Sequence, residues 1–174
     1  MVRPRAAPVS GPAVPLAASA LRVQAALDAL GLAAHVRELT VPARTAQEAA
    51  DALGVPVGAI AKSLVFRAAS AGAVMVVAAG DRRVDEARIG AALGEPIGRA
   101  DAAFVREVTG YAIGGIPPLG HATTLVLFVD ASLARFETVW AAGGTPHAIF
   151  PIAPAALFGL PGARQVDVAR PPEG

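Results

Sequence analysis

A loop rich in glycine and proline, GGIPPLGH at Gly114–His121, carries the clearest chemical signal in this chain. The adjacent Gly114 and Gly115 let the backbone turn sharply and let a ligand approach peptide N–H groups without obstruction by side chains. Pro117 and Pro118 stiffen the loop and lower the entropy that it loses on adopting one shape. Such a loop predicts a cradle for an oxyanion or a phosphate; a tight structural turn between buried strands would explain the same residues equally well.

A single lysine is the second signal. Of the 15 basic residues in the chain, Lys62 alone is lysine and the others are arginine. A compact, rotatable ammonium and a planar guanidinium do different work, so a lysine kept in such an arginine-rich chain indicates a need for an amine. The alternative is an ordinary surface residue.

The three histidines, His35, His121 and His147, are scattered and accompany no carboxylate cluster that would suit a metal, so we predict no metal site. His121 adjoins the glycine loop, and His147 lies in a second Gly/Pro-rich turn, GGTPH, that could line the same pocket. We interpret His35, in an expected strand, as structural. The chain also lacks the G-x-S-x-G, H-E-x-x-H, Walker A and Rossmann motifs, which argues against the enzyme classes built on them.

Length and composition limit the function further. With 174 residues the chain has the size of one domain, and its net charge of +1 gives no broad basic field for coating DNA or RNA. Any contact with RNA should therefore be local. The absence of cysteine excludes disulfides, cysteine-bound zinc and thiol nucleophiles, and it suits a cytoplasmic protein.

Hydrophobic residues make up 54% of the chain, and residues 108–129 and 138–163 contain no Asp, Glu, Lys or Arg. Either stretch is long enough to span a bilayer. Both are interrupted by several glycines and prolines, which would leave backbone groups without partners in hydrocarbon. We expect buried strands and tight loops here, and no membrane association.

Several elements must position the loop and the lysine. We expect residues 1–15, rich in Pro and Ala, to form a disordered leader, and residues 16–174 to form a single domain. The expected helices are 19–30 (ended by Gly31), 45–53 (opened by a Thr45–Glu48 capping box and ended by Gly54), 84–93 (ended by Gly94) and 101–108 (capped by Asp101), with brief helical turns after Asp130 and at 153–158.

The expected strands are 35–39, 59–66, 73–79, 111–113, 124–129, 148–152 and 165–168. The pair 59–66 and 73–79 should form a hairpin with Lys62 near its start. Because strands and helices do not alternate strictly, the pattern predicts an α+β fold with a mixed, barrel-like sheet flanked by short helices.

Four segments together resemble one known family. The segments AKSLVF at 61–66, VMVVAA at 74–79, GGIPPLGH at 114–121 and GTPHAIF at 144–150 occur in the order and spacing of the YbaK/EbsC family, which includes the insertion-type editing domain of bacterial prolyl-tRNA synthetases. The resemblance spans residues 21–168. It implies the same barrel-like fold, no metal, no cofactor and no covalent intermediate. The family's G-x-x-x-P loop falls on Gly114–Pro118 and its functional lysine on Lys62, whereas a catalytic His121 would go beyond the family pattern.

The resemblance implies a free-standing, trans-editing aminoacyl-tRNA deacylase. Its substrate would be the acceptor end (CCA) of a tRNA, most simply proline tRNA, carrying Ala, 2-aminobutyrate, Cys, Ser or Thr by mistake, and prolyl-tRNA synthetase is a candidate partner. The expected catalytic residues are Lys62, Gly114 and Gly115, and the expected substrate contacts are Ile116, Pro117, Pro118, His121 and His147.

Two alternatives remain open at this point. One is a non-catalytic module that binds aminoacyl-tRNA or a nucleotide as a synthetase accessory. The other is an unrelated hydrolase with His121 as its general base. The sequence also leaves open whether Lys62 would hold a phosphate or stabilise developing charge.

Overall fold

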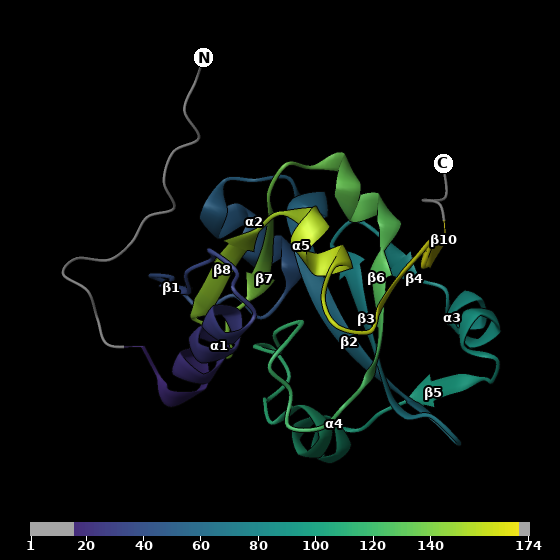
Figure 1. Cartoon of the computed structure of the whole chain (residues 1–174). Helices are drawn as coiled ribbons and strands as arrows, with labels where there is room; N and C mark the ends of the chain where they lie inside the picture. Colours follow the sequence, from purple (N-terminus) through teal and green to yellow (C-terminus); the bar gives the residue numbers. More distant parts are fainter. Residues whose placement is uncertain (1–15, 171–174) are drawn as a thin grey trace.

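One mixed sheet organises the molecule (Figure 1). The computed structural model describes residues 16–170. The eight strands of the sheet are β1 (Arg37–Glu38), β2 (Ile60–Ala68), β3 (Gly72–Ala79), β5 (Ile97–Arg99), β6 (Val126–Asp130), β7 (Val139–Ala142), β8 (Ala148–Ile152) and β9 (Ala163–Val166). Their order is β1-β8-β7-β2-β3-β6-β9, and β5 pairs with β2 beside this path. The contacts β2·β7, β3·β6 and β6·β9 are parallel and the others antiparallel.

Short helices surround the sheet. They are α1 (Ala18–Ala29), α2 (Ala46–Leu53), α3 (Glu86–Leu93), α4 (Ala102–Thr109) and α5 (Pro154–Phe158), with 3-10 turns η1 (Val57–Ala59) and η2 (Ala131–Arg135). A small second sheet pairs β4 (Arg83–Val84) with β10 (Ala169–Arg170). In Figure 1, α3 lies at the right edge and α4 at the bottom, while α1 lies at the front left. The predicted α+β class with a mixed sheet is confirmed.

The helix ends follow from local hydrogen bonding, as predicted. The Thr45 hydroxyl accepts the N–H of Glu48 at 3.1 Å, and the Asp101 carboxylate accepts the N–H of Phe104 at 2.8 Å. These side chains satisfy donors that the first helical turn leaves without partners. At the other ends, glycines such as Gly54 adopt the left-handed conformation that closes a helix with little strain.

The central strand β3 explains why residues 73–79 form a continuous apolar run. It is paired on both sides, and all its residues from Val74 to Ala79 have no exposed surface. Met75 and Val77 point into the main core, which also contains Phe150, whereas Val74 and Val76 face a second cluster. A strand covered on both faces has no polar side, so period-two alternation disappears.

Most of the predicted elements are confirmed, including the β2–β3 hairpin, with the following differences. Residues 111–113 form no strand, because the Tyr111 N–H donates to the Thr109 hydroxyl at 3.0 Å within a loop. The helix expected from 84 begins at Glu86, because Asp85 caps it and Val84 pairs in β4. Strands β5 and β7 were not predicted. The leader expected at 1–15 lies outside the described residues.

Membrane-spanning helices are also absent from the part of the chain that the structure describes. No helix within residues 16–170 has the length and the apolar character needed to cross a bilayer.

Candidate active site

A cavity of about 250 Å³ lies where the sheet, α2 and the glycine loop meet. The sheet contributes Ile60, Ala61, Lys62, Ser63, Leu64, Trp140, Ala142, Ala148 and Ile149, and Leu39 directly follows β1. The helix α2 and the loop before it contribute Ala43, Arg44, Thr45, Ala46 and Ala49, and the remaining residues are Ile113, Gly114, Ile116 and Pro146. None of these described lining residues is Asp, Glu or His.

Strand pairing opens this cavity. The parallel contact between β2 and β7 covers only two residue pairs, Ile60 with Trp140 and Ala61 with Ala141. Beyond Ala61, β2 continues without β7 beside it, so Lys62 and the two residues after it are left at the cavity wall. The long-range pairing of β2 therefore positions the lysine.

Lys62 has a half-buried side chain with no ion-pair partner within 4.0 Å among the described residues. Burial lowers the pKa of its ammonium, and the negative charges of Asp81 and Asp130 oppose that effect. Besides the cavity, Lys62 lines a neighbouring hollow together with Asp81, Arg82 and Arg83. The lysine is thus a cation free to receive an anion from either side.

The two adjacent glycines have different structural roles: Gly114 lines the cavity, and Gly115 packs against a neighbouring loop. Gly114 lines the cavity with φ +101°, in the left-handed region, and its N–H donates to no acceptor within residues 16–170. Gly115 packs against the next loop, since a Cβ on it would lie 2.7 Å from the backbone N and Cα of Thr145. The Gly115 carbonyl accepts the N–H of Gly144 at 2.9 Å, and its own N–H donates to Ala112 at 3.2 Å. Of the two N–H groups, only that of Gly114 lacks an acceptor within residues 16–170.

The other predicted contact residues separate into two groups. Ile116 lines the cavity beside Gly114, whereas the buried Pro117 and Pro118 follow it without lining the cavity. Pro118 and His121 line a different, largely apolar cavity of about 350 Å³ against α1. His147 is exposed and lines neither cavity; its carbonyl accepts the N–H of Leu39 at 2.6 Å.

His121 lies outside the cavity that holds Lys62 and the Gly114 N–H. Its Nε2 lies 2.7 Å from the carbonyl oxygen of Pro117, which can only accept, so Nε2 carries a proton. Burial lowers the pKa of the imidazole, which keeps the ring neutral near pH 7. The basic lone pair of this neutral ring is then on Nδ1, but the ring lines the cavity against α1 and not the cavity that holds Lys62 and Gly114.

Replacing His121 by alanine should therefore reduce deacylation by less than about tenfold, because loss of a true general base costs about 10²–10⁴-fold. The measurement is the single-turnover rate of amino-acid release, with the melting temperature as a control for folding. A loss of a hundredfold or more in a variant that melts normally would restore His121 as the base.

Three residues that line the cavity were not predicted as site residues from the sequence. Arg44 is one of many arginines, and its side-chain stem lies near Gly114. Ser63 follows Lys62, and its hydroxyl is buried without a hydrogen-bond partner in the structure. Trp140, with the Arg37 guanidinium 5.6 Å from its ring centre, lies on the unpredicted strand β7. Adjacency to the lone lysine was the only feature that could have marked Ser63.

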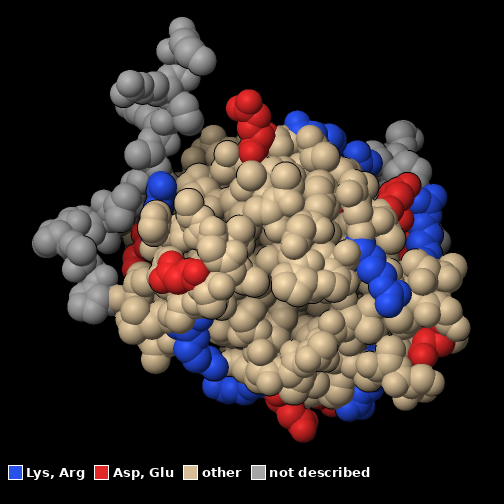
Figure 2. All heavy atoms as spheres, viewed as in Figure 1, with Lys and Arg blue, Asp and Glu red and all other residues tan. Residues whose placement is uncertain are grey.

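Charge on the surface is dispersed. The face shown in Figure 2 carries scattered acidic and basic side chains separated by large areas of neither kind, with no continuous basic patch. This agrees with a contact to nucleic acid that is confined to a few residues.

Comparison with known proteins places this geometry in a family. The model of the aminoacyl-tRNA editing domain matches residues 40–160 of the chain, a segment that holds both Lys62 and the glycine loop. The chain belongs to the aminoacyl-tRNA editing domain family. This membership supports an aminoacyl-tRNA deacylase function in general terms, with the aminoacyl end of a tRNA as substrate.

Three individual proteins are similar to this chain over most of its length. A crystal structure described as that of a proposed trans-editing enzyme for prolyl tRNA synthetase is 44% identical, with a TM-score of 0.85 over 90% of this chain and 100% of that one. The crystal structure of hypothetical protein APE2540 is 34% identical, with a TM-score of 0.81 over 86% and 99% of the two chains. The uncharacterized protein YwhH of Bacillus subtilis (strain 168) is 34% identical over 122 residues, which are 70% of this chain and 78% of YwhH.

Proposed function

We propose that this editing-domain protein is a free-standing deacylase that removes a small, wrongly attached amino acid from proline tRNA and so corrects products of prolyl-tRNA synthetase. The observation that carries the proposal is the cavity itself, which joins an unpaired ammonium at Lys62 to a glycine loop with an available N–H at Gly114. The similarity to a proposed trans-editing enzyme for prolyl tRNA synthetase supports the choice of tRNA.

An aminoacyl ester is already activated, so its hydrolysis needs a placed water, a fixed carbonyl and stabilisation of the oxyanion. The Gly114 N–H would donate to the carbonyl oxygen as negative charge develops there. Lys62 would stabilise that charge or bind the terminal phosphate, and both roles require the protonated amine. The elements behind the two groups, β2 and the loop buttressed by Gly115, hold them in place before substrate arrives.

A hydroxyl of the substrate would help to orient and activate the attacking water. No Asp, Glu or His is among the described cavity residues, whereas the terminal ribose carries a free hydroxyl beside the ester. We therefore expect tRNA ending in an adenosine without that hydroxyl to be deacylated about a hundredfold more slowly or worse. The comparison uses single-turnover rates of the two esters with the same amino acid; equal rates would contradict this step.

The amino acid would be selected by an apolar wall. Ile113, Ile116 and Ile149 line the cavity, and one methylene in such a site is worth about 1–3 kcal/mol. This composition favours alanine and 2-aminobutyrate over the polar serine and threonine. A panel of proline tRNAs charged with these amino acids and with cysteine, assayed at one enzyme concentration, ranks them directly, and fastest release of serine or threonine would contradict the assignment.

A further inference from the structure

Lys62 and Asp81 line the same hollow, yet they form no ion pair. The hollow lies beside the cavity and is lined by Lys62, Leu64, Phe66, Gly80, Asp81, Arg82, Arg83 and Val84. A half-buried lysine next to an aspartate usually gains by pairing with it, because each charge then recovers part of the solvation that burial removed. Something in the fold must keep the two apart.

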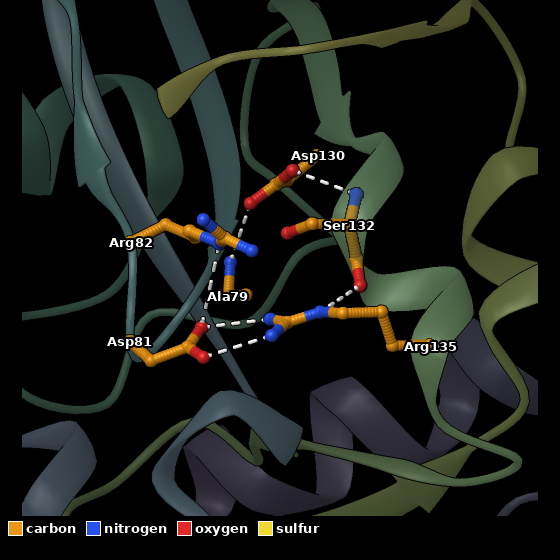
Figure 3. Close-up of polar contacts among 6 residues, drawn as sticks. All are labelled: Ala79, Asp81, Arg82, Asp130, Ser132 and Arg135. Atoms are coloured by element: carbon orange, nitrogen blue, oxygen red, sulfur yellow. Dashed lines mark hydrogen bonds and ion pairs between the residues drawn. The ribbon is translucent and has the colours of Figure 1, made fainter. Parts of the chain in front are cut away.

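Asp81 pairs instead with two arginines, closely with Arg135 and at 3.9 Å with Arg82 Nε (Figure 3). Arg135 makes the stronger contact. Its two terminal nitrogens donate to the two carboxylate oxygens at 2.9 and 2.7 Å, and its Nε donates to the Ser132 carbonyl at 2.7 Å. A bidentate pair of this kind fixes both the distance and the plane of the carboxylate. These hydrogen bonds to Arg135 also hold the pKa of Asp81 below its usual value, so the group is an anion at neutral pH.

Gly58 completes this clamp. A Cβ on Gly58 would lie 2.8 Å from Asp81 Oδ2 and 3.0 Å from the ring of Phe136. Only glycine therefore leaves room for the carboxylate in the position that Arg135 imposes. The backbone of η1 and the side chain of Arg135 thus both contact the Asp81 carboxylate, which otherwise remains open to solvent.

Asp130, the second carboxylate near Lys62, also has other hydrogen-bond partners. Asp130 is completely buried and accepts hydrogen bonds from the N–H groups of Ala79 at 3.0 Å and Ser132 at 2.9 Å. Figure 3 shows its carboxylate directed toward the backbone of these two residues. Both acidic groups near Lys62 thus have other partners.

We propose that Arg135 is a positioning residue, which binds Asp81, withholds that carboxylate from Lys62 and so leaves the ammonium free for the oxygens of the substrate. The inference rests on the proposed function, since it explains how the catalytic lysine stays available. It also assigns a use to an exposed surface arginine far from Lys62 in sequence.

A double-mutant cycle tests this role. Arg135→Met keeps an apolar stem and leaves Asp81 with only the longer contact to Arg82 Nε at 3.9 Å. The released carboxylate should then turn toward Lys62 and lower kcat/KM roughly tenfold. Adding Asp81→Asn should return kcat/KM to within about threefold of the wild-type value, because the released group no longer carries charge. If Arg135 served only the fold, removing a second member of the clamp would leave activity as low or lower, and that outcome overturns the proposal.

Lys62 can also be observed without any activity assay. Because it is the only lysine, reductive methylation with ¹³C labels one side chain besides the α-amino group, and the label keeps the positive charge. The NMR titration should show a higher pKa for the Lys62 amine in Arg135→Met than in wild type, and a return in the double variant. An unchanged titration in Arg135→Met would overturn the proposal.

Arg88→Met is the matched control, since it removes another surface pair, Arg88–Asp167 at 2.8 Å, and should change neither measurement. Failure of the proposed function remains distinguishable: wild-type protein would then release no amino acid, while the titration would still report whether Arg135 controls the charge next to Lys62.

Discussion

Replacing Lys62 by alanine should lower kcat/KM for deacylation by about 10²–10³-fold, the range found when one preorganised group that stabilises an oxyanion is removed. The cavity contains no other lysine, and its only other cationic lining residue is Arg44. The melting temperature should change little, because Lys62 makes no ion pair within the described residues. Rates from single-turnover release of labelled amino acid, compared at equal folded concentration, give the measurement.

Lys62→Arg is the matched variant for charge. It keeps the cation but replaces a compact ammonium by a larger planar group, so we expect it to recover only part of the lost activity. Full activity in Lys62→Ala would remove the lysine from the mechanism. Full activity in Lys62→Arg would show that charge alone is needed.

The same lysine gives a pH dependence with a defined sign. The protonated amine is the active form, so activity persists below its pKa and falls as the pH rises through it. Because burial lowers this pKa from the usual 10.5, the fall should come at a lower pH than for an exposed lysine. Alkaline ester hydrolysis without enzyme must be subtracted at each pH.

Gly115→Ala should have the second large effect. The new Cβ would lie 2.7 Å from the backbone of Thr145, and a backbone cannot move aside as a flexible side chain can. Either loop must shift, and the hydrogen bond from Gly144 to Gly115 would be strained or lost. A displacement of about 1 Å at a reacting group can cost about a hundredfold in rate, so we expect a loss of that order in kcat.

Stability should fall too, by about 1–3 kcal/mol, as for other overpacked sites. Gly98→Ala is the control, since the nearest atom to its new Cβ is the Arg67 carbonyl oxygen at 4.0 Å and its φ is ordinary. Thermal unfolding and deacylation are measured on both variants. If Gly115→Ala is as active and as stable as Gly98→Ala, the close approach of Gly115 to Thr145 is not needed for activity or stability.

Local chemistry made much of the fold predictable. Capping side chains such as Thr45 and Asp101 and the glycines that end helices act within a few residues, so their patterns can be read directly. Lys62 and the glycine loop could each be singled out for a different reason, because an unusual residue type and an unusual loop stood out from an Ala- and Arg-rich background. That they belong to one site was implied by the resemblance to the YbaK/EbsC family.

The remaining site depends on contacts between distant parts of the chain. Trp140 enters the cavity only because β7 pairs in parallel with β2, about eighty residues earlier, and no local pattern encodes that pairing. Likewise, His121 follows the glycine loop in sequence but turns to its other side, where it donates to Pro117. Sequence proximity to a loop does not say which face of the loop a side chain occupies.

Arg135 and Lys62 show why arginine and lysine are not interchangeable in this chain. Arg135 holds a carboxylate with a planar, bidentate grip that a lysine could not reproduce, while Lys62 presents a point charge to the cavity. Arg135 and Lys62 therefore relate to Asp81 in opposite ways: the arginine binds the carboxylate, and the lysine forms no ion pair with it.

The most direct test is the rate at which the wild-type protein releases alanine from proline tRNA that has been mischarged with alanine. Release of proline from the correctly charged proline tRNA is measured beside it. The account predicts rapid release of alanine, intact tRNA as the second product and little release of proline. If the protein binds both tRNAs but the alanyl ester decays only at its spontaneous rate, the cavity is a binding site and the deacylase assignment is wrong.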